Sequence, residues 1–122
     1  KQLESNMDFT KAVDAHVSWI IKLQEAIEGG QKLDPGEVGK DTLCELGKWI
    51  YGEGAVHRDK PAYQVLKAKH TEFHQSASEV VRKVNANDLA GAITMVDKGG
   101  AFIRVSTETV NAIMKLKKEL GM

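Results

Sequence analysis

The 122-residue sequence has one cysteine, two prolines, no net charge and no long run of apolar residues. A single cysteine cannot form a disulfide within the chain, which excludes a disulfide-stapled secreted domain and fits a reducing compartment such as the cytoplasm. The 17 basic and 17 acidic residues cancel, so nothing in the charge points to a nucleic-acid partner or to an anionic membrane surface. The apolar runs are too short to span a bilayer, and no signal peptide is visible.

The length is sufficient for one domain with a single hydrophobic core. We therefore expect residues 1–122 to form one domain. The first residue is Lys1 instead of methionine, so we interpret the chain as a piece excised from a longer protein.

Apolar residues recur at steps of three and four residues in four stretches, a spacing that predicts amphipathic helices. These stretches are Phe9–Ile27, Tyr63–Val84, Leu89–Val96 and Phe102–Leu120. Helix-starting residues precede three of them, namely Ser5, Pro61 and Asp88. Gly29 is placed to stop the first helix. The pair Gly99-Gly100 either kinks one long final helix or separates two helices.

A shorter helical stretch contains the only cysteine, in the sequence LCELGKW at residues 43–49. Asp41 or Thr42 is placed to cap this helix, and Gly52 to end it. No window shows the alternation of a strand bounded by hairpin signals. The sequence therefore predicts an all-α fold, an antiparallel four-helix bundle with one additional short helix carrying the cysteine.

Three of the four histidines lie where core residues belong. His16 lies on the apolar stripe of the first helix, and His70 and His74 lie one turn apart on the stripe of the helix that follows Pro61. Separate core histidines, each hydrogen-bonded to a carbonyl group, are the simplest explanation of any one of them. Three inward imidazoles together favour a shared metal ion, because facing helices of a bundle commonly build metal sites.

Cys44 is the candidate for a fourth metal ligand. A lone buried cysteine is usually an inert small apolar residue, but beside three inward histidines it completes a His3Cys set. Such a set suits Zn²⁺ in a closed tetrahedral site, whereas a soft thiolate argues against Mg²⁺ and Ca²⁺ and leaves Co²⁺, Ni²⁺ and copper possible. Gly47 lets another backbone or ring approach closely. We expect His57 to lie in a solvated loop and not to bind the metal.

Three motifs in this order and at these separations resemble the chemoreceptor zinc-binding (CZB) domain family: HVSW at 16–19, CELGKW at 44–49 and HTEFH at 70–74. The resemblance extends from about Ser5 to Leu120. It implies zinc ligation by a set of four residues, His16, Cys44, His70 and His74. It also implies packing around the site by three more, Trp19, Gly47 and Trp49.

The resemblance further implies a cytoplasmic bacterial sensory module, attached to a chemoreceptor signalling domain or a diguanylate cyclase. In that family, zinc or oxidation of the cysteine alters the output of the attached domain, and some members are linked to sensing hypochlorous acid. Cys44 is then the redox switch. The family also tends to form homodimers, and Ile21, Met95 and Met114 lie off the main stripes as candidates for a dimer surface. We expect no nucleic-acid partner and no direct membrane contact.

Other functions are less well matched. The zinc-protease motif requires Glu directly after the first His, whereas Glu72 comes two residues after His70. A closed four-ligand zinc site also lacks the open position that catalysis requires, so we do not expect an enzyme. A hemerythrin-like di-iron bundle needs more histidines and inward carboxylates, and Asp14 and Glu72 lie off the stripes. A metal-free helical interaction or dimerisation module remains the other alternative.

Overall fold

The computed structural model describes residues 8–29, 33–42 and 44–121, and all regular structure within these ranges is helical. The all-α fold is therefore confirmed. The elements in chain order are α2 (Phe9–Gly29), α3 (Pro35–Val38), α4 (Glu45–Tyr51), the 3₁₀ helix η1 (Glu53–His57), α5 (Pro61–Asn85), α6 (Leu89–Val96) and α7 (Ala101–Glu119). The expected cap Ser5 and the neighbour of the cysteine, Leu43, lie outside the described residues.

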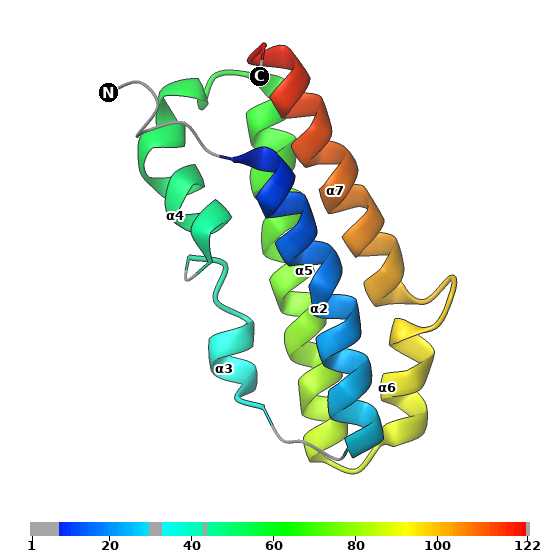
Figure 1. The fold of residues 1–122 in the computed structure, drawn as a ribbon. Helices are drawn as coiled ribbons and strands as arrows, with labels where there is room; N and C mark the ends of the chain where they lie inside the picture. The colour runs from blue at the N-terminus through cyan, green and yellow to red at the C-terminus, as the bar shows by residue number, and fades with distance from the viewer. Residues whose placement is uncertain (1–7, 30–32, 43, 122) are drawn as a thin grey trace.

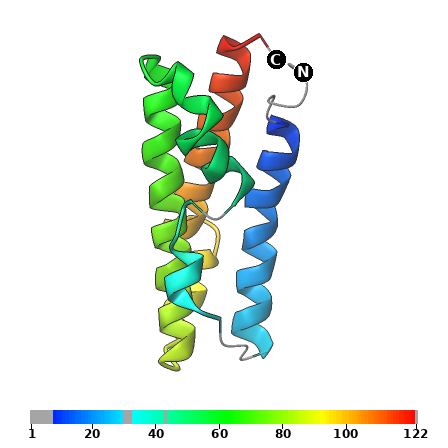
Figure 2. The ribbon, with the colours of Figure 1, turned by 90° about the vertical axis from the view of Figure 1, so that its left-hand side faces the viewer.

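The chain passes along the long axis of the bundle four times (Figures 1 and 2). Helices α2 and α5 run in one direction, while the segment containing α3, α4 and η1 returns between them, and α6 and α7 follow one another back along the bundle. The second pass thus consists of three short helices where one additional short helix was expected. The four predicted stripes correspond to α2, α5, α6 and α7, but the last two share one pass.

A glycine pair divides this last pass into two helices. Gly99 has a φ of +83°, a left-handed conformation that favours glycine. A Cβ atom at Gly100 would lie 2.3 Å from the carbonyl oxygen of Thr94. Asp88 caps α6 as predicted, accepting a hydrogen bond from the Gly91 N–H at 3.0 Å. Gly99-Gly100 therefore separates two helices and does not merely kink one.

The apolar core has two parts, which we name after one aromatic residue of each. The Phe9 cluster comprises Phe9, Ala12, Leu46, Ile50, Ala62, Tyr63, Leu66, Ala112, Ile113 and Leu116. The Phe73 cluster comprises Leu23, Ile27, Val38, Phe73, Ala77, Val80, Val81, Val84, Ala92, Val96 and Phe102. Along α2, α5 and α7 the residues between the two clusters include buried polar ones, namely His16, His70 and Thr109. The polar positions therefore interrupt the core midway along the bundle.

The helix ends and surface follow the expected pattern with one exception. Pro61 lies in the first turn of α5, and Gly52 follows the last residue of α4 as its cap. Ile21 and Met114 are at least half exposed, but Met95 packs against the Phe73 cluster and is a poor candidate for a contact surface. Among the described residues, no helix is long and apolar enough to cross a membrane.

Candidate metal centre

His16 lies on α2 at the junction of the two clusters and is almost fully buried. Its Nδ1 atom lies 2.7 Å from the carbonyl oxygen of Ala12. Because a carbonyl oxygen only accepts, Nδ1 carries the ring proton and Nε2 presents a bare lone pair. This Nε2 atom is buried and has no hydrogen-bond partner among the residues that the structure describes. A buried acceptor without a donor is costly unless a ligand completes it.

His70 and His74 lie one turn apart on α5, as expected, and both are buried. The Nδ1 atom of His74 donates to the carbonyl oxygen of Val38 at 2.9 Å, so its Nε2 also presents a lone pair. The two Nε2 atoms of this pair are 3.2 Å apart. Backbone carbonyl groups of α2 and of α3 therefore orient two of the three imidazoles, which is the usual arrangement for histidine ligands of metals.

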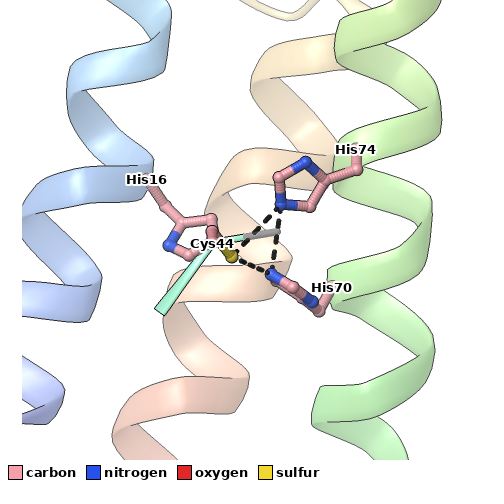
Figure 3. A group of neighbouring side chains, drawn as sticks. All are labelled: His16, Cys44, His70 and His74. Carbon is pink, nitrogen blue, oxygen red and sulfur yellow. Dashed lines mark hydrogen bonds between the residues drawn. The ribbon is translucent and has the colours of Figure 1, made fainter. Parts of the chain in front are cut away.

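Cys44 is the N-cap residue of α4 and lies just outside the helix, with Sγ accepting a hydrogen bond from the Gly47 N–H at 3.3 Å. The expectation that the cysteine lies on the helix, capped by Asp41 or Thr42, was wrong. A cap side chain folds back over the first turn to satisfy a free N–H group. This geometry brings Sγ to 3.1 Å from His70 Nε2 and 3.6 Å from His74 Nε2 (Figure 3).

Gly47 makes this position of the cysteine possible. A Cβ atom on Gly47 would lie 1.7 Å from the carbonyl oxygen of Asp41, so the backbone leading to Cys44 passes directly over the helix at a point where only glycine fits. The close backbone approach expected at this glycine is therefore present. Any side chain here would push the cysteine segment away from α4.

The aromatic residues near the site pack against the two core clusters. Trp49 contacts Phe9 edge-to-face with ring centroids 5.3 Å apart, and Trp19 packs against the Phe73 cluster. His57 was expected in a solvated loop, but it lies at the end of η1, partly buried and stacked on Trp49 at 6.1 Å. Stacking against the Trp49 indole covers one face of the imidazole ring, and this contact accounts for the partial burial of His57. His57 stays outside the group of converging donor atoms.

The structure brings the four predicted ligand residues together: His16, Cys44, His70 and His74 each offer one donor atom, all within 4.8 Å of one another. Zinc bonds of about 2.0–2.3 Å in a tetrahedron place the donor atoms about 3.3–3.6 Å apart. The three contacts among Cys44, His70 and His74 measure 3.1, 3.6 and 3.2 Å. Three nitrogen donors and one sulfur donor, with no carboxylate among them, fit Zn²⁺ better than Mg²⁺, Ca²⁺ or a di-iron centre.

Burial sets the protonation states of these groups. It lowers the pKa of His16 and His74 and, with the positive charges of the two other histidines, lowers the pKa of His70 to about 3. Burial raises the pKa of the Cys44 thiol, although nearby backbone N–H groups oppose it. The imidazoles are therefore neutral near pH 7, as metal binding requires, and a metal ion must displace only the thiol proton.

Three neighbouring residues had no signal in the sequence that linked them to the site. Asp41 appeared only as a possible helix cap, Thr71 only as a residue between the two histidines of the HTEFH motif, and Tyr51 in no motif. Thr71 and Tyr51 both donate hydrogen bonds to the Asp41 carboxylate. Only the folded chain shows that this group lies beside the segment that carries Cys44.

Comparison with known proteins identifies the family. The model of the chemoreceptor zinc-binding domain matches residues 16–81, which is 66 of the 122 residues and includes all four donor residues. The chain belongs to the chemoreceptor zinc-binding domain family. No curated protein and no solved structure matches it. As a CZB domain, the chain has Zn²⁺ as its cofactor, and the His3Cys group is positioned to bind the ion.

Proposed function

We propose that this CZB domain is the sensory part of a bacterial signalling protein and that His16, Cys44, His70 and His74 ligate one Zn²⁺ ion. One observation carries the proposal: bare lone pairs of His16 and His74 converge with the Cys44 sulfur in a buried place. Within the part of the chain that the structure describes, no residue outside the four proposed ligands donates a hydrogen bond to either lone pair. Neutral, preoriented imidazoles around a thiol are a prepared site for a soft divalent cation.

The Cys44 sulfur is the redox switch in this proposal. A zinc ion held by His16, Cys44, His70 and His74 would supply the positive charge that keeps the Cys44 sulfur as a thiolate. The thiolate reacts with an oxidant such as hypochlorous acid: the O–Cl bond breaks, an S–O bond forms and the hydroxyl group passes to sulfur. Sulfur gives up two electrons, chloride leaves with them, and sulfenic acid remains. A sulfenic acid is a poorer ligand than a thiolate, so Cys44 separates from the three histidines and the α4 segment moves.

The moving segment would pass the signal to an attached domain, either a chemoreceptor signalling domain or a diguanylate cyclase, in the cytoplasm. The lengths of α3 and α4 support this role, because helices of four and seven residues have little stability of their own. All four proposed ligands come from the protein and leave no open position on the metal, which supports a regulatory function over a catalytic one.

Metal analysis of the purified protein tests the proposed ligands. We expect about one zinc per chain in the wild type, and loss of most of it in His70→Ala and Cys44→Ser. His57→Ala is the matched control, because His57 lies outside the donor group, and it should keep its zinc. Two irons per chain would instead favour a hemerythrin-like centre. No metal, even after addition of zinc, would favour a metal-free interaction module.

Oxidant sensing needs a separate test. Hypochlorous acid added in equal amount to the zinc-loaded wild type should release zinc to a chromogenic chelator, with formation of Cys44 sulfenic acid seen by mass spectrometry. His57→Ala should respond like the wild type. Zinc release without modification of Cys44, or modification without release, would contradict the switch.

We also propose that the domain forms a homodimer through α2, on which Val17 and Ile21 are exposed apolar residues one turn apart. Sedimentation analysis of the wild type and of Ile21→Arg tests this. The variant should shift toward the monomer. A wild type that is monomeric at all concentrations would overturn the dimer without affecting the zinc site.

A further inference from the structure

A carboxylate lies beside the site without touching the proposed ligands. Asp41 Oδ2 accepts a hydrogen bond from Thr71 Oγ1 at 2.6 Å and another from the Tyr51 hydroxyl at 2.8 Å. The Thr71 hydroxyl also lies 3.1 Å from the carbonyl oxygen of Lys67, so its single proton goes to the closer Asp41. Thr71 is the residue after His70 on α5, and Tyr51 is the last residue of α4. The Asp41 carboxylate thus joins two helices of the site.

The backbone of the same residue holds the start of α4. The carbonyl group of Asp41 lies against Gly47, where a Cβ atom would come within 1.7 Å of the oxygen. Cys44 lies between these two residues in the chain and is bonded to the Gly47 N–H. Asp41 therefore contacts α4 at its first turn through its backbone and at its last residue through its side chain.

Other contacts hold the neighbouring parts of this pass but not the cysteine itself. His74 bonds the carbonyl group of Val38, before Asp41, and Tyr63 donates to the carbonyl group of Ile50, after Cys44. Between these two points, the described part of the segment makes side-chain hydrogen bonds to α5 at Asp41, with Thr71, and at Cys44, with His70 and His74. The one at Asp41 is the only one of these that does not involve a proposed metal ligand. Burial acts to raise the pKa of Asp41, but the hydrogen bonds from Thr71 and Tyr51, together with the nearby His70 and His74, lower it overall. The carboxylate is therefore ionised and accepts both hydrogen bonds strongly.

We propose that Asp41 is the positioning residue of Cys44: its carboxylate, held between Thr71 and Tyr51, fixes the cysteine segment on α5 and so sets how tightly Cys44 holds the metal. The inference rests on the proposed function, because it takes Cys44 as a zinc ligand. It adds that the contribution of Cys44 to zinc affinity depends on Asp41, three residues earlier in the chain. The hydrogen bonds of Asp41 act on the position of the cysteine and do not involve the metal.

Both hydrogen bonds end on the same oxygen atom, Asp41 Oδ2. Substitutions of Asp41 can therefore separate the effect of losing the hydrogen bonds from the effect of losing the negative charge. An asparagine whose amide oxygen replaces Oδ2 still accepts both bonds but has no negative charge. Asp41→Ala loses the bonds as well as the charge. Thr71→Val and Tyr51→Phe each remove one donor and keep the rest of the fold.

The experiment measures zinc affinity by competition with a chelator. We expect Asp41→Ala to weaken zinc binding about 10-fold, the low end of the range for losing a group bonded to a metal ligand, because Asp41 acts on Cys44 only through the backbone. Asp41→Asn should stay close to the wild type, and Thr71→Val and Tyr51→Phe should fall between. Asp59→Ala is the matched control, since Asp59 is exposed. Equal affinities of Asp41→Ala and the wild type would overturn the inference.

A double-mutant cycle with Cys44→Ser shows whether Asp41 acts through the cysteine. If it does, adding Asp41→Ala to Cys44→Ser should change zinc affinity less than about 2-fold, because no coupling remains to be lost. An equal loss in both backgrounds would mean a general effect on folding or on the histidines, and would overturn the inference. If Asp41→Ala fails to fold, Thr71→Val decides the question in the same two backgrounds. A wild type without zinc would refute the proposed function itself, whereas these outcomes presuppose it.

Discussion

The three histidines and the cysteine of the site come from regions that differ in how much structure supports them. His16 is carried by the 21-residue α2, and His70 and His74 by the 25-residue α5, both of which contribute to both core clusters. Cys44 precedes the seven-residue α4, which is too short to be stable by itself. The difference teaches that the histidine side of the site, α2 and α5, is held in place by the apolar core before a metal binds. The cysteine side, Cys44 and α4, depends on the few hydrogen bonds and contacts of its own segment.

Removal of zinc should have the largest effect and should divide the two regions. Structural zinc contributes about 10–16 kcal/mol of apparent binding free energy in small zinc fingers. Here we expect amide hydrogen exchange to accelerate in α3 and α4 when a chelator removes the metal, while α2 and α5 stay protected. Circular dichroism should stay helical because the two apolar clusters need no metal. A random-coil spectrum would contradict the comparison.

Shortening a buried side chain of the core should destabilise the histidine side, whether or not zinc is bound. Phe73 has no exposed surface and contacts the His16 ring with centroids 4.8 Å apart. Phe73→Ala should therefore lower the free energy of unfolding by about 3–5 kcal/mol, with or without zinc. Denaturant unfolding measures this, with Val56→Ala at an exposed position as the control. A loss confined to the zinc-free protein would show that the metal, and not the core, supports α5.

A methyl group at Gly47 should damage the cysteine side selectively. The new Cβ atom would overlap the Asp41 carbonyl oxygen, so Gly47→Ala should cost about 1–3 kcal/mol or more and should weaken zinc binding. Gly29→Ala is the control, because nothing lies within 4 Å of its Cβ position. Calorimetry and chelator competition check both variants. Normal zinc affinity in Gly47→Ala would mean that Cys44 does not need this backbone contact.

In the zinc-free protein, the pH dependence of the free energy of unfolding should distinguish the two regions. The histidine side should affect stability in acid and the cysteine side in alkali. The pKa of His70 is about 3 in the folded chain, below the ordinary value of 6.5. Between these values the unfolded chain binds more protons. The free energy of unfolding should therefore fall as the pH falls below 6.5, by about 1.4 kcal/mol per pH unit for one imidazole.

The cysteine has the reverse sign. Burial raises the pKa of Cys44 above its ordinary 9.0, so the folded chain binds more protons in alkali and stability falls as the pH rises past 9. Denaturant titrations from pH 4 to 10 test both arms, with His70→Gln expected to reduce the acid slope and Cys44→Ser the alkaline one. Slopes unchanged by these variants would assign the pH effects to other residues.

The same contrast explains what the sequence could predict. The stripes of α2 and α5 and the inward positions of their histidines follow from helical periodicity over five or more turns, which dominates any local contact. The second pass has no such periodicity. Its three short helices depend on single contacts, such as the Cys44 sulfur on the Gly47 N–H and the Asp41 carbonyl group on Gly47. Contacts between residues that no spacing rule connects are visible only in the folded chain.

The buried polar residues between the two clusters have one more consequence, for how the chain finds its native alignment. His16, His70 and Thr109 lie on α2, α5 and α7 with apolar residues on either side. A slip of α5 by one turn, about 5.4 Å, would drive an imidazole into one of the apolar clusters, where its nitrogen atoms find no partner. Helices with uninterrupted apolar stripes have no such penalty against sliding. The polar layer therefore acts as a register mark, as a buried asparagine does in coiled coils.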